Sequence, residues 1–466
     1  MPQVIKFAIC IAIGFFFWHF PLSPDIPKTA QEVFAVFLAV IASFLLRPLP
    51  MGALVLLALI TLMITKTITM EEALSGYGDS TVWLVVAAFL ISGAVVETGF
   101  GRRVALFFIS KFGKNIFGIA YGLCASELLL GPVVPSNTAR GGGIHAPIAR
   151  SLSEALDSYP DKQPDRAGSY LTLVGSHANM ITAGMFLTGM AANPLLAKAA
   201  AEILRVELDW ITWAKGTIVP GLISLFFLPL FMYKIAKPEL RDTKEVQKKV
   251  KEQYRSLGAW KRGEVWMAFT FVLLILLWTT SSIHGMDTTL VAWVGVCILF
   301  LSNTHGWDRM IRNFGAWDAL IWLGGLLTMA SLLKDHGFVD WFGQGVSEIL
   351  PDIHPIMLLM LIAAVYFYSM YLFSQLTAHI AAFIGGFFAL ALTHSIPPMV
   401  MAICLAAFST LCGCLTPYAS GPCIIYFGQG YNSLSRWFRV GFLVSLYHLT
   451  IWFIVGLGWW KLLGWW

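Results

Sequence analysis

Charged residues are scarce in this chain: Asp, Glu, Lys and Arg make up 12% of its 466 residues, and 58% are hydrophobic. A soluble globular domain has about 25% charged residues, so this composition excludes a water-soluble globular protein, and its hydrophobicity excludes a disordered one. The 31 basic residues outnumber the 26 acidic ones by only five, and ten of them lie in one segment, 234–262. We therefore expect no nucleic-acid partner.

Reactive and metal-binding patterns are missing too. The seven cysteines are scattered, mostly within apolar runs, which predicts buried thiols and neither a disulfide framework nor a metal cage. The apolar segments hold no paired carboxylates, no HExxH or GxSxG motif and no Cys/His pair. Since such arrangements carry out much of hydrolytic and group-transfer chemistry, we expect no enzyme activity, no cofactor and no bound metal. A membrane enzyme stays the alternative of a different class.

Long apolar runs fill most of the chain instead. About 20 apolar residues cross the roughly 30 Å hydrocarbon layer as a helix, and aromatic clusters such as the closing GLGWWKLLGWW are typical of membrane interfaces. Eleven segments are predicted to span the bilayer: 4–21, 31–47, 51–67, 82–98, 168–195, 214–233, 264–283, 288–303, 317–333, 400–427 and 440–460.

Two further apolar stretches, 115–150 and 355–394, are interrupted at mid-length by the polar clusters VVPSNTARGGG and LFSQLTAHIAAF. A polar break at membrane depth is tolerated only where protein or a water-filled cavity shelters the backbone. Both stretches are therefore predicted to be re-entrant helical hairpins, which add no crossing.

The cations then fall on one side of the membrane, which the positive-inside rule makes the cytoplasm. They include Lys6, the turn at Arg47, the stretch 101–114 and the segment 234–262. We expect an inner (cytoplasmic) membrane protein with the amino terminus inside and the carboxyl terminus outside. In the stretch 101–114, charged residues alternate with bulky apolar ones, as in an amphipathic helix at a membrane interface.

An internal repeat relates the two halves of the chain. Trp83-Leu84 and Trp322-Leu323 head similar segments, and 55 residues separate Trp83 from Thr138 as well as Trp322 from Thr377. The predicted span count makes the two helices run in opposite directions, which indicates inverted-topology repeats, typical of transporters. The predicted parts are an N-terminal half (1–234), a basic cytoplasmic linker (235–262) and a C-terminal half (263–466).

The predicted fold is thus all-α and polytopic, with about 11 transmembrane helices and two re-entrant hairpins in two inverted repeats. After its hairpin, each half also continues to a broken span, which contains TGMAANPLL in the first half and LTPYASGPC in the second. Half-helix amino ends attract carboxylates and carbonyl ends attract cations, so the hairpin tips and these breaks are expected to enclose a small anion. The candidate substrate-binding residues are Ser136, Asn137, Thr138, Gln375, Thr377, Asn193, Ser420 and Gly421.

Some of these residues have structural alternatives. A hydrogen-bonded turn would also explain Ser136 to Thr138, and Asn193 is equally open to a structural role. The same tripeptide recurs at 302–304, but there it lacks a flanking Pro-Gly break and a repeat partner, so it is predicted to be an interfacial loop.

Two ionisable residues follow the tips at matching positions. Arg140 and His379 each lie two residues beyond a tip, and intramembrane ionisable groups are functional candidates. We expect them to compensate the charge of the bound anion; the alternatives are a structural pairing for Arg140 and a neutral core histidine for His379. Glu127 lies about ten residues up the opposite arm, roughly 15 Å along a helix, so no Glu127–Arg140 pair is expected.

The segments ETGFGRR, PSNTARGGG and SQLTAHIAAF resemble the divalent anion:sodium symporter (DASS) family, especially its bacterial citrate, tartrate and 2-oxoglutarate/malate exchanger branch. The resemblance implies a homodimer with an elevator mechanism, in which a Ser-Asn-Thr triad at each tip contacts substrate carboxylates and helps to bind sodium. Ser136, Asn137 and Thr138 match the first triad. At the second tip only Thr377 matches, because Gln375 and Leu376 replace the Ser and Asn.

The lost second triad and the two cations together predict sodium-independent exchange of di- or tricarboxylates such as 2-oxoglutarate, malate, succinate or citrate. Sodium-coupled dicarboxylate symport is the alternative, since the first triad is complete. A channel is less favoured, because no ring of carbonyls or charges is evident in the sequence.

Overall fold

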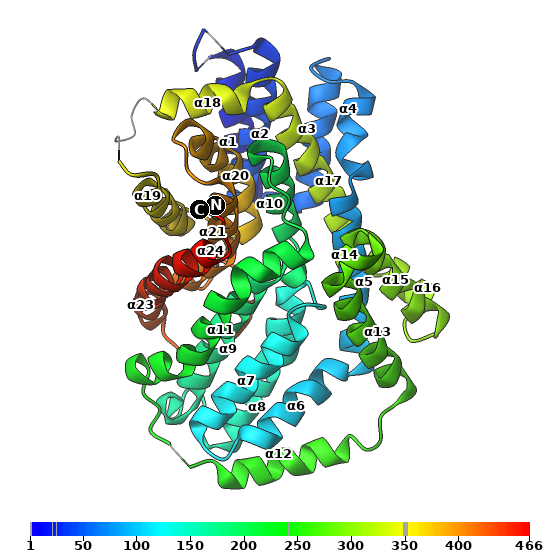
Figure 1. Ribbon diagram of the computed structural model, residues 1–466, viewed down its shortest axis with the longest axis vertical. Helices are drawn as coiled ribbons and strands as arrows, with labels where there is room; N and C mark the ends of the chain where they lie inside the picture. The colour runs from blue at the N-terminus through cyan, green and yellow to red at the C-terminus, as the bar shows by residue number, and fades with distance from the viewer. Residues whose placement is uncertain (1, 21, 25, 241, 348–352) are drawn as a thin grey trace.

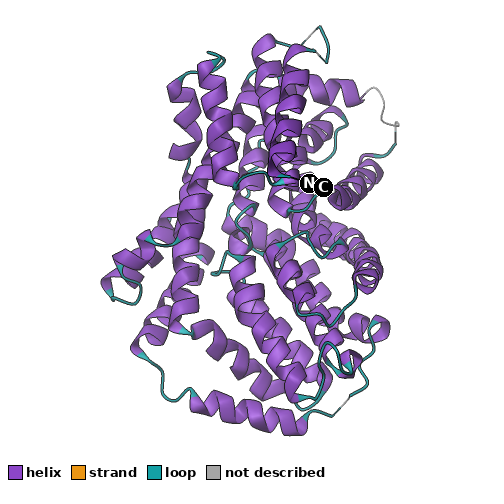
Figure 2. Ribbon diagram, turned by 180° about the vertical axis from the view of Figure 1, so that it is seen from behind, coloured by secondary structure: helices purple, strands orange, loops and turns teal. Residues whose placement is uncertain are grey.

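Helices arranged side by side make up the described chain, with no strand between them (Figure 1; Figure 2). The computed structural model describes residues 2–466 except 21, 25, 241 and 348–352. Residue 21, the end of the first predicted span, and residue 241 of the predicted linker lie outside the described residues. Low charge and long apolar runs favour this architecture, because a helix satisfies its own backbone hydrogen bonds in lipid.

Nine segments of the described chain are long and apolar enough to cross a membrane. They are α2 (Lys28–Leu46), α5 (Ser80–Thr98), α11 (Trp210–Ile235), α13 (Arg262–Thr279), α17 (Phe314–Asp335), Pro355–Leu372, α20 (Leu376–Thr393), Pro398–Leu415 and Leu434–Leu462. Four shorter apolar helices accompany them: α1 (Gln3–His19), α3 (Met51–Ile64), α7 (Ile116–Leu130) and α15 (Thr288–Leu301). Each of the eleven predicted spans lies on one helix or on consecutive helices, and the predicted all-α polytopic fold is confirmed.

Both predicted hairpins consist of two helical arms joined by a non-helical tip. In the first, α7 leads to the tip, and the returning arm consists of η2 (Thr138–His145) and α8 (Ala146–Ala155). In the second, α19 (Pro355–Tyr368) and the short turn η6 (Ser369–Leu372) lead to the tip, and α20 returns. The tips fall at the polar clusters, where Pro135 in the first and the extended backbone of Gln375 in the second end the helical hydrogen bonding.

The two predicted broken spans are interrupted as expected. The first consists of α9 (Gly168–Met185), η4 (Leu187–Gly189) and α10 (Asn193–Ala199), and every residue of α9 is buried. The second consists of α21 (Pro398–Leu411), η7 (Cys412–Leu415) and α22 (Gly421–Gly428). Asn193 closes the first break, because its Nδ2 donates to the carbonyls of Ala183 and Phe186 at 2.8 and 2.9 Å. Carbonyls at a helix end lack intrahelical partners, and the Phe186 carbonyl also accepts from the backbone N–H of Gly189.

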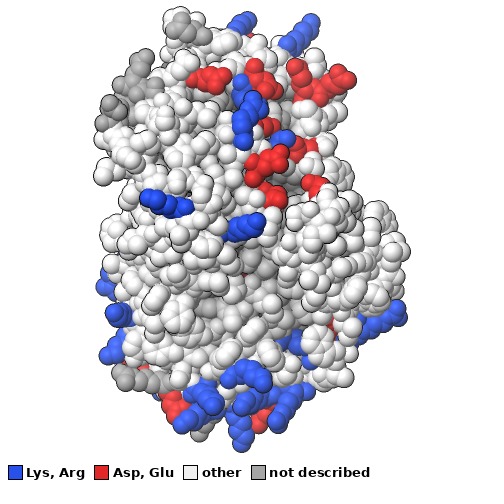
Figure 3. Space-filling view, in the orientation of Figure 1, with Lys and Arg blue, Asp and Glu red and all other residues white. Residues whose placement is uncertain are grey.

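Amphipathic helices and basic residues mark one end of the molecule. The stretch predicted to be amphipathic forms α6 (Phe100–Phe112), and the basic segment forms α12 (Lys244–Ser256). In Figure 3, basic side chains crowd the end at which Figure 1 places α12, whereas most of the visible acidic side chains lie toward the other end. The basic end carries α12, which belongs to the predicted cytoplasmic linker, and the side of the membrane on which it lies stays a prediction.

An ion pair connects the start of α5 with α10. Lys198 Nζ lies 2.7 Å from the carboxylate of Asp79, which also accepts a hydrogen bond from Thr81 N and so caps α5. Burial raises the pKa of Asp79, but the hydrogen bonds from Lys198 and Thr81 outweigh it and hold the pKa below its ordinary value. The pair therefore stays charged at neutral pH and joins the first broken span to a neighbouring helix.

Candidate functional site

The first tip, residues 136–138, presents hydroxyl groups at the start of a helical arm. Ser136 Oγ accepts a hydrogen bond from the backbone N–H of Ala139 at 3.1 Å. Asn137 is buried, and its carbonyl accepts from Asn179 Nδ2 of α9 at 3.2 Å. Thr138 is exposed, and its hydroxyl lies beside Gly421.

The second tip, residues 374–377, differs from the first in its central residue. Gln375 and Thr377 are partly exposed, but the Leu376 side chain is buried. It packs beside Gly413 of η7, where an added Cβ would lie 3.3 Å from Leu376 Cδ2. An apolar side chain therefore fills the place where the resemblance predicts an amide.

The second broken span brings the two tips together. The carbonyl of Ala419 accepts a hydrogen bond from the backbone N–H of Leu376 at the second tip, at 3.0 Å. Two residues further on, Gly421 lies against the first tip: a Cβ at this position would be 2.3 Å from Thr138 Oγ1. Both tips, far apart in the sequence, thus flank the turn 419–421.

The first broken span borders the same place. Ser420 Oγ is 3.8 Å from Met180 Sδ, and an added Cβ on Gly413 would be 2.9 Å from that sulfur. The structure therefore brings together Thr138, the backbone of the second tip, Ser420 and Gly421. Asn193 differs from these residues, because its buried amide nitrogen is used to brace the break in its own span.

Arg140 is fully buried and paired, contrary to the expectation that Glu127 lies too far away. Its Nε is 2.7 Å from Glu127 Oε2, and its guanidinium also donates to the carbonyls of Val134 and Gly189 and to Thr182 Oγ1. The estimate of 15 Å measured the separation along a single helix. The chain reverses at the tip, so the two arms run side by side and the long arginine side chain bridges them.

Glu127 is the centre of a hydrogen-bonded network. Besides Arg140, its carboxylate accepts from Asn179 Nδ2 at 3.1 and 3.2 Å and from Thr182 Oγ1 at 3.2 Å, and His145 Nδ1 lies 3.0 Å away. The network ties the first hairpin to α9. The charge of Arg140 is therefore balanced within the protein, which argues against its predicted role of compensating the substrate charge.

His379 also differs from its predicted role. The ring is fully buried among Tyr366, Phe373 and Phe383, and Nε2 lies 2.8 Å from Ser369 Oγ and 3.1 Å from the Tyr366 carbonyl. Nδ1 has no partner within the described part of the chain. A protonated ring would leave an unpaired donor in these apolar surroundings, so this conformation fits the neutral core histidine that the sequence left open.

Another arginine reaches the second tip. Arg47, at the turn between α2 and α3, donates from Nη2 to the carbonyl of Ser374 at 2.9 Å. From the sequence, Arg47 is expected only among the cations of one membrane face. Its separation of 327 residues from Ser374 leaves no sequence signal for the contact.

The recurring tripeptide at 302–304 ends α15. The backbone N–H of Thr304 donates to the carbonyl of Leu299, and Asn303 adopts a left-handed conformation with φ of 55°. This turn fits the predicted loop and explains the tripeptide by helix termination alone.

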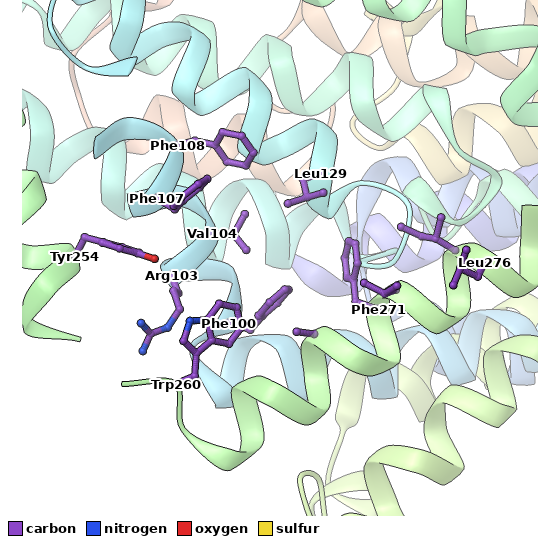
Figure 4. Close-up of a pocket in the computed structure, with 13 residues that line it drawn as sticks. Phe100, Arg103, Val104, Phe107, Phe108, Leu129, Tyr254, Trp260, Phe271 and Leu276 are labelled. Atoms are coloured by element: carbon purple, nitrogen blue, oxygen red, sulfur yellow. The ribbon is translucent and has the colours of Figure 1, made fainter. Parts of the chain in front are cut away.

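A cavity of about 460 Å³ between α6, α7 and α13 is a poor site for a dicarboxylate. Figure 4 shows Phe100, Phe107 and Phe108 of α6 along it, with Phe271 and Leu276 of α13 nearby. Its charged lining residue, Arg103, is bonded to Glu264 at 2.8 and 2.9 Å. The cavity offers an apolar wall and a neutralised cation, whereas the tips offer hydroxyl side chains on partly or fully exposed residues.

Comparisons with known proteins agree with this architecture. Residues 2–466 match a family described as the sodium:sulfate symporter transmembrane region. YflS of Bacillus subtilis (strain 168), whose name assigns it malate transport provisionally, is 39% identical over 465 residues, which cover 100% of this chain and 97% of that protein. Dicarboxylate transporter 1 of Arabidopsis thaliana chloroplasts is 36% identical over 459 residues, which cover 98% of this chain and 82% of that protein.

Solved structures support the fold. The YdaH transporter of Alcanivorax borkumensis superimposes with a TM-score of 0.57 at 13% identity and covers 99% of this chain and 97% of its own. MtrF of Neisseria gonorrhoeae gives the same TM-score at 12% identity, with 97% and 93% covered. At these identities the likeness concerns the fold alone.

Proposed function

Because the chain belongs to the family of sodium:sulfate symporter transmembrane regions, in agreement with its resemblance to the divalent anion:sodium symporters, we propose that it exchanges di- and tricarboxylates across the cytoplasmic membrane without sodium. The chain is a membrane transporter rather than an enzyme, and relatives named as dicarboxylate transporters support carboxylate anions as its substrates. We further propose a homodimer with an elevator movement, an inside amino terminus and an outside carboxyl terminus.

The observation that carries the proposal is the meeting of the two tips at residues 419–421. The arms that begin at the tips, η2 and α20, each direct the positive end of a helix dipole toward the tip. An anion with a carboxylate at each end matches two such ends placed on either side of one turn. Citrate, malate, succinate and 2-oxoglutarate all have this shape.

Leu376 supports sodium independence. Neither tip, nor the turn between them, contains Asp or Glu, and hard cations prefer oxygen ligands. The buried Leu376 side chain beside Gly413 offers none. A cation at this tip would have only the neutral side-chain oxygens of Ser374, Gln375 and Thr377 and the backbone carbonyls as ligands, and Arg47 already donates to one of the carbonyls, that of Ser374.

Sodium-coupled symport stays as a second candidate, and one structural observation favours it. An unpaired charge that crosses the membrane would slow the return of an empty carrier. Glu127 neutralises Arg140, so Arg140 does not slow that return. The complete first tip, Ser136 to Thr138, keeps the groups that the family uses toward sodium.

Uptake of labelled succinate by proteoliposomes containing the purified protein tests the proposal. We expect uptake only into vesicles loaded with malate or succinate, at the same rate with sodium or potassium outside. Uptake into empty vesicles that requires sodium would establish the symporter instead. Protein-free liposomes are the control for leakage.

A further inference from the structure

Arg47 occupies a strained position between two helices. It follows the last residue of α2 with φ of 52°, a left-handed conformation that costs a non-glycine residue about 1 kcal/mol or more. Its backbone N–H donates to the Ser43 carbonyl at 2.7 Å and thereby ends the helix. The side chain is exposed and extends to the Ser374 carbonyl of the second tip.

The charge of Arg47 is not balanced in the described part of the protein. No carboxylate of the described residues lies within 4.0 Å of its guanidinium, whereas Arg103, Arg140 and Arg150 each have a glutamate partner. One hydrogen bond to a neutral carbonyl uses one of the five N–H groups and leaves the charge in place. The remaining donors suit a carboxylate, which guanidinium groups bind in a two-pronged geometry.

Arg47 also stands next to the proposed substrate site. Ser374, which it contacts, is followed by Gln375 and by Leu376, whose N–H is bonded to Ala419. The turn 419–421 then leads to Thr138 of the first tip. A chain of direct contacts thus links the Arg47 guanidinium to both tips.

We propose that Arg47 binds one carboxylate of the transported dianion and supplies the positive charge that neither Arg140 nor His379 provides. This inference rests on the proposed function, because it assumes a dicarboxylate between the tips. Arg47 belongs to the α2–α3 turn and not to a hairpin, so the complete site is built from two separate parts of the fold.

Calorimetric titration of the purified protein with succinate and with its monoamide, succinamate, tests the role of Arg47. We expect R47Q to weaken succinate binding about 10- to 100-fold, the usual range for a lost charge-assisted hydrogen bond, and to affect succinamate far less. R47K keeps the charge without the fork of donors and should fall between R47Q and the unaltered protein. R150Q, which removes another exposed arginine, should leave both affinities unchanged.

The outcomes distinguish failure of the proposed function from failure of the Arg47 role. If the unaltered protein binds no dicarboxylate, the proposed function itself is overturned. If the unaltered protein binds succinate and R47Q binds it equally well, the role of Arg47 is overturned while the function stands. Equal weakening of succinate and succinamate would make Arg47 a positioning residue for the tip and contradict the charge role. Thermal unfolding of each variant, measured in parallel, identifies any loss that comes from misfolding.

Discussion

Replacing Glu127 with Gln is expected to destabilise the protein by about 3–5 kcal/mol, because it leaves the Arg140 guanidinium charged and unpaired in the interior. Both side chains of the pair are fully buried. The E127Q protein should unfold at clearly lower temperature in detergent and lose dicarboxylate uptake together with its fold. R140A should behave similarly, since it strands the Glu127 carboxylate with only neutral donors and His145 nearby.

The E127Q/R140Q double variant and E154Q are the matched controls. The double variant removes both charges and should recover most of the lost stability, because two neutral amides cost far less to bury than one unpaired ion. E154Q breaks an exposed pair of similar length with Arg150, 2.8 Å against 2.7 Å, and should change the stability little, because solvent screens an exposed pair. Wild-type stability of E127Q would show that the Glu127–Arg140 network does not hold the first hairpin.

A methyl group on Gly421 is expected to disrupt the meeting of the two tips. The Cβ of G421A would lie 2.3 Å from Oγ1 and 2.8 Å from Cγ2 of Thr138, so the first tip and the turn must separate. Overpacking of this kind costs about 1–3 kcal/mol. We expect dicarboxylate affinity to fall about 10- to 100-fold, measured as the substrate concentration that half-saturates exchange.

Gly428 supplies the control on the same helix. Among the described residues, no heavy atom outside its own helix turn lies within 4 Å of a Cβ built there, so G428A should transport like the unaltered protein. A second comparison, G421A/T138A, removes both of the nearest Thr138 atoms and should regain thermal stability relative to G421A. Full transport by G421A would mean that the contact between Thr138 and the 419–421 turn is not part of the site.

The sequence predicts much of the fold because its signals are local. Apolar runs of span length, and polar breaks containing Pro and Gly, determine where each helix begins and ends. The repeat spacing from Trp83 to Thr138 and from Trp322 to Thr377 adds that two tips are equivalent. These features predict both hairpins and both broken spans.

Contacts across the fold were not predictable in the same way. Glu127 and Arg140 face one another only because the hairpin reverses, and a distance counted along one helix misses this. Arg47 meets Ser374 through packing between distant segments. The burial of Leu376 beside Gly413 likewise depends on where η7 lies. Charge balance at the site depends on these contacts. Because they are not visible in the sequence, the sequence pointed to Arg140 and His379 as the residues that compensate the substrate charge.

The central claim is that one dicarboxylate lies between both hairpin tips at the 419–421 turn. A cryo-electron microscopy structure of the protein with saturating succinate tests it most directly. The account predicts density for a four-carbon anion in contact with Thr138, Thr377 and the backbone of residues 419–421. Succinate density away from both tips, with the tips themselves unoccupied, would contradict it.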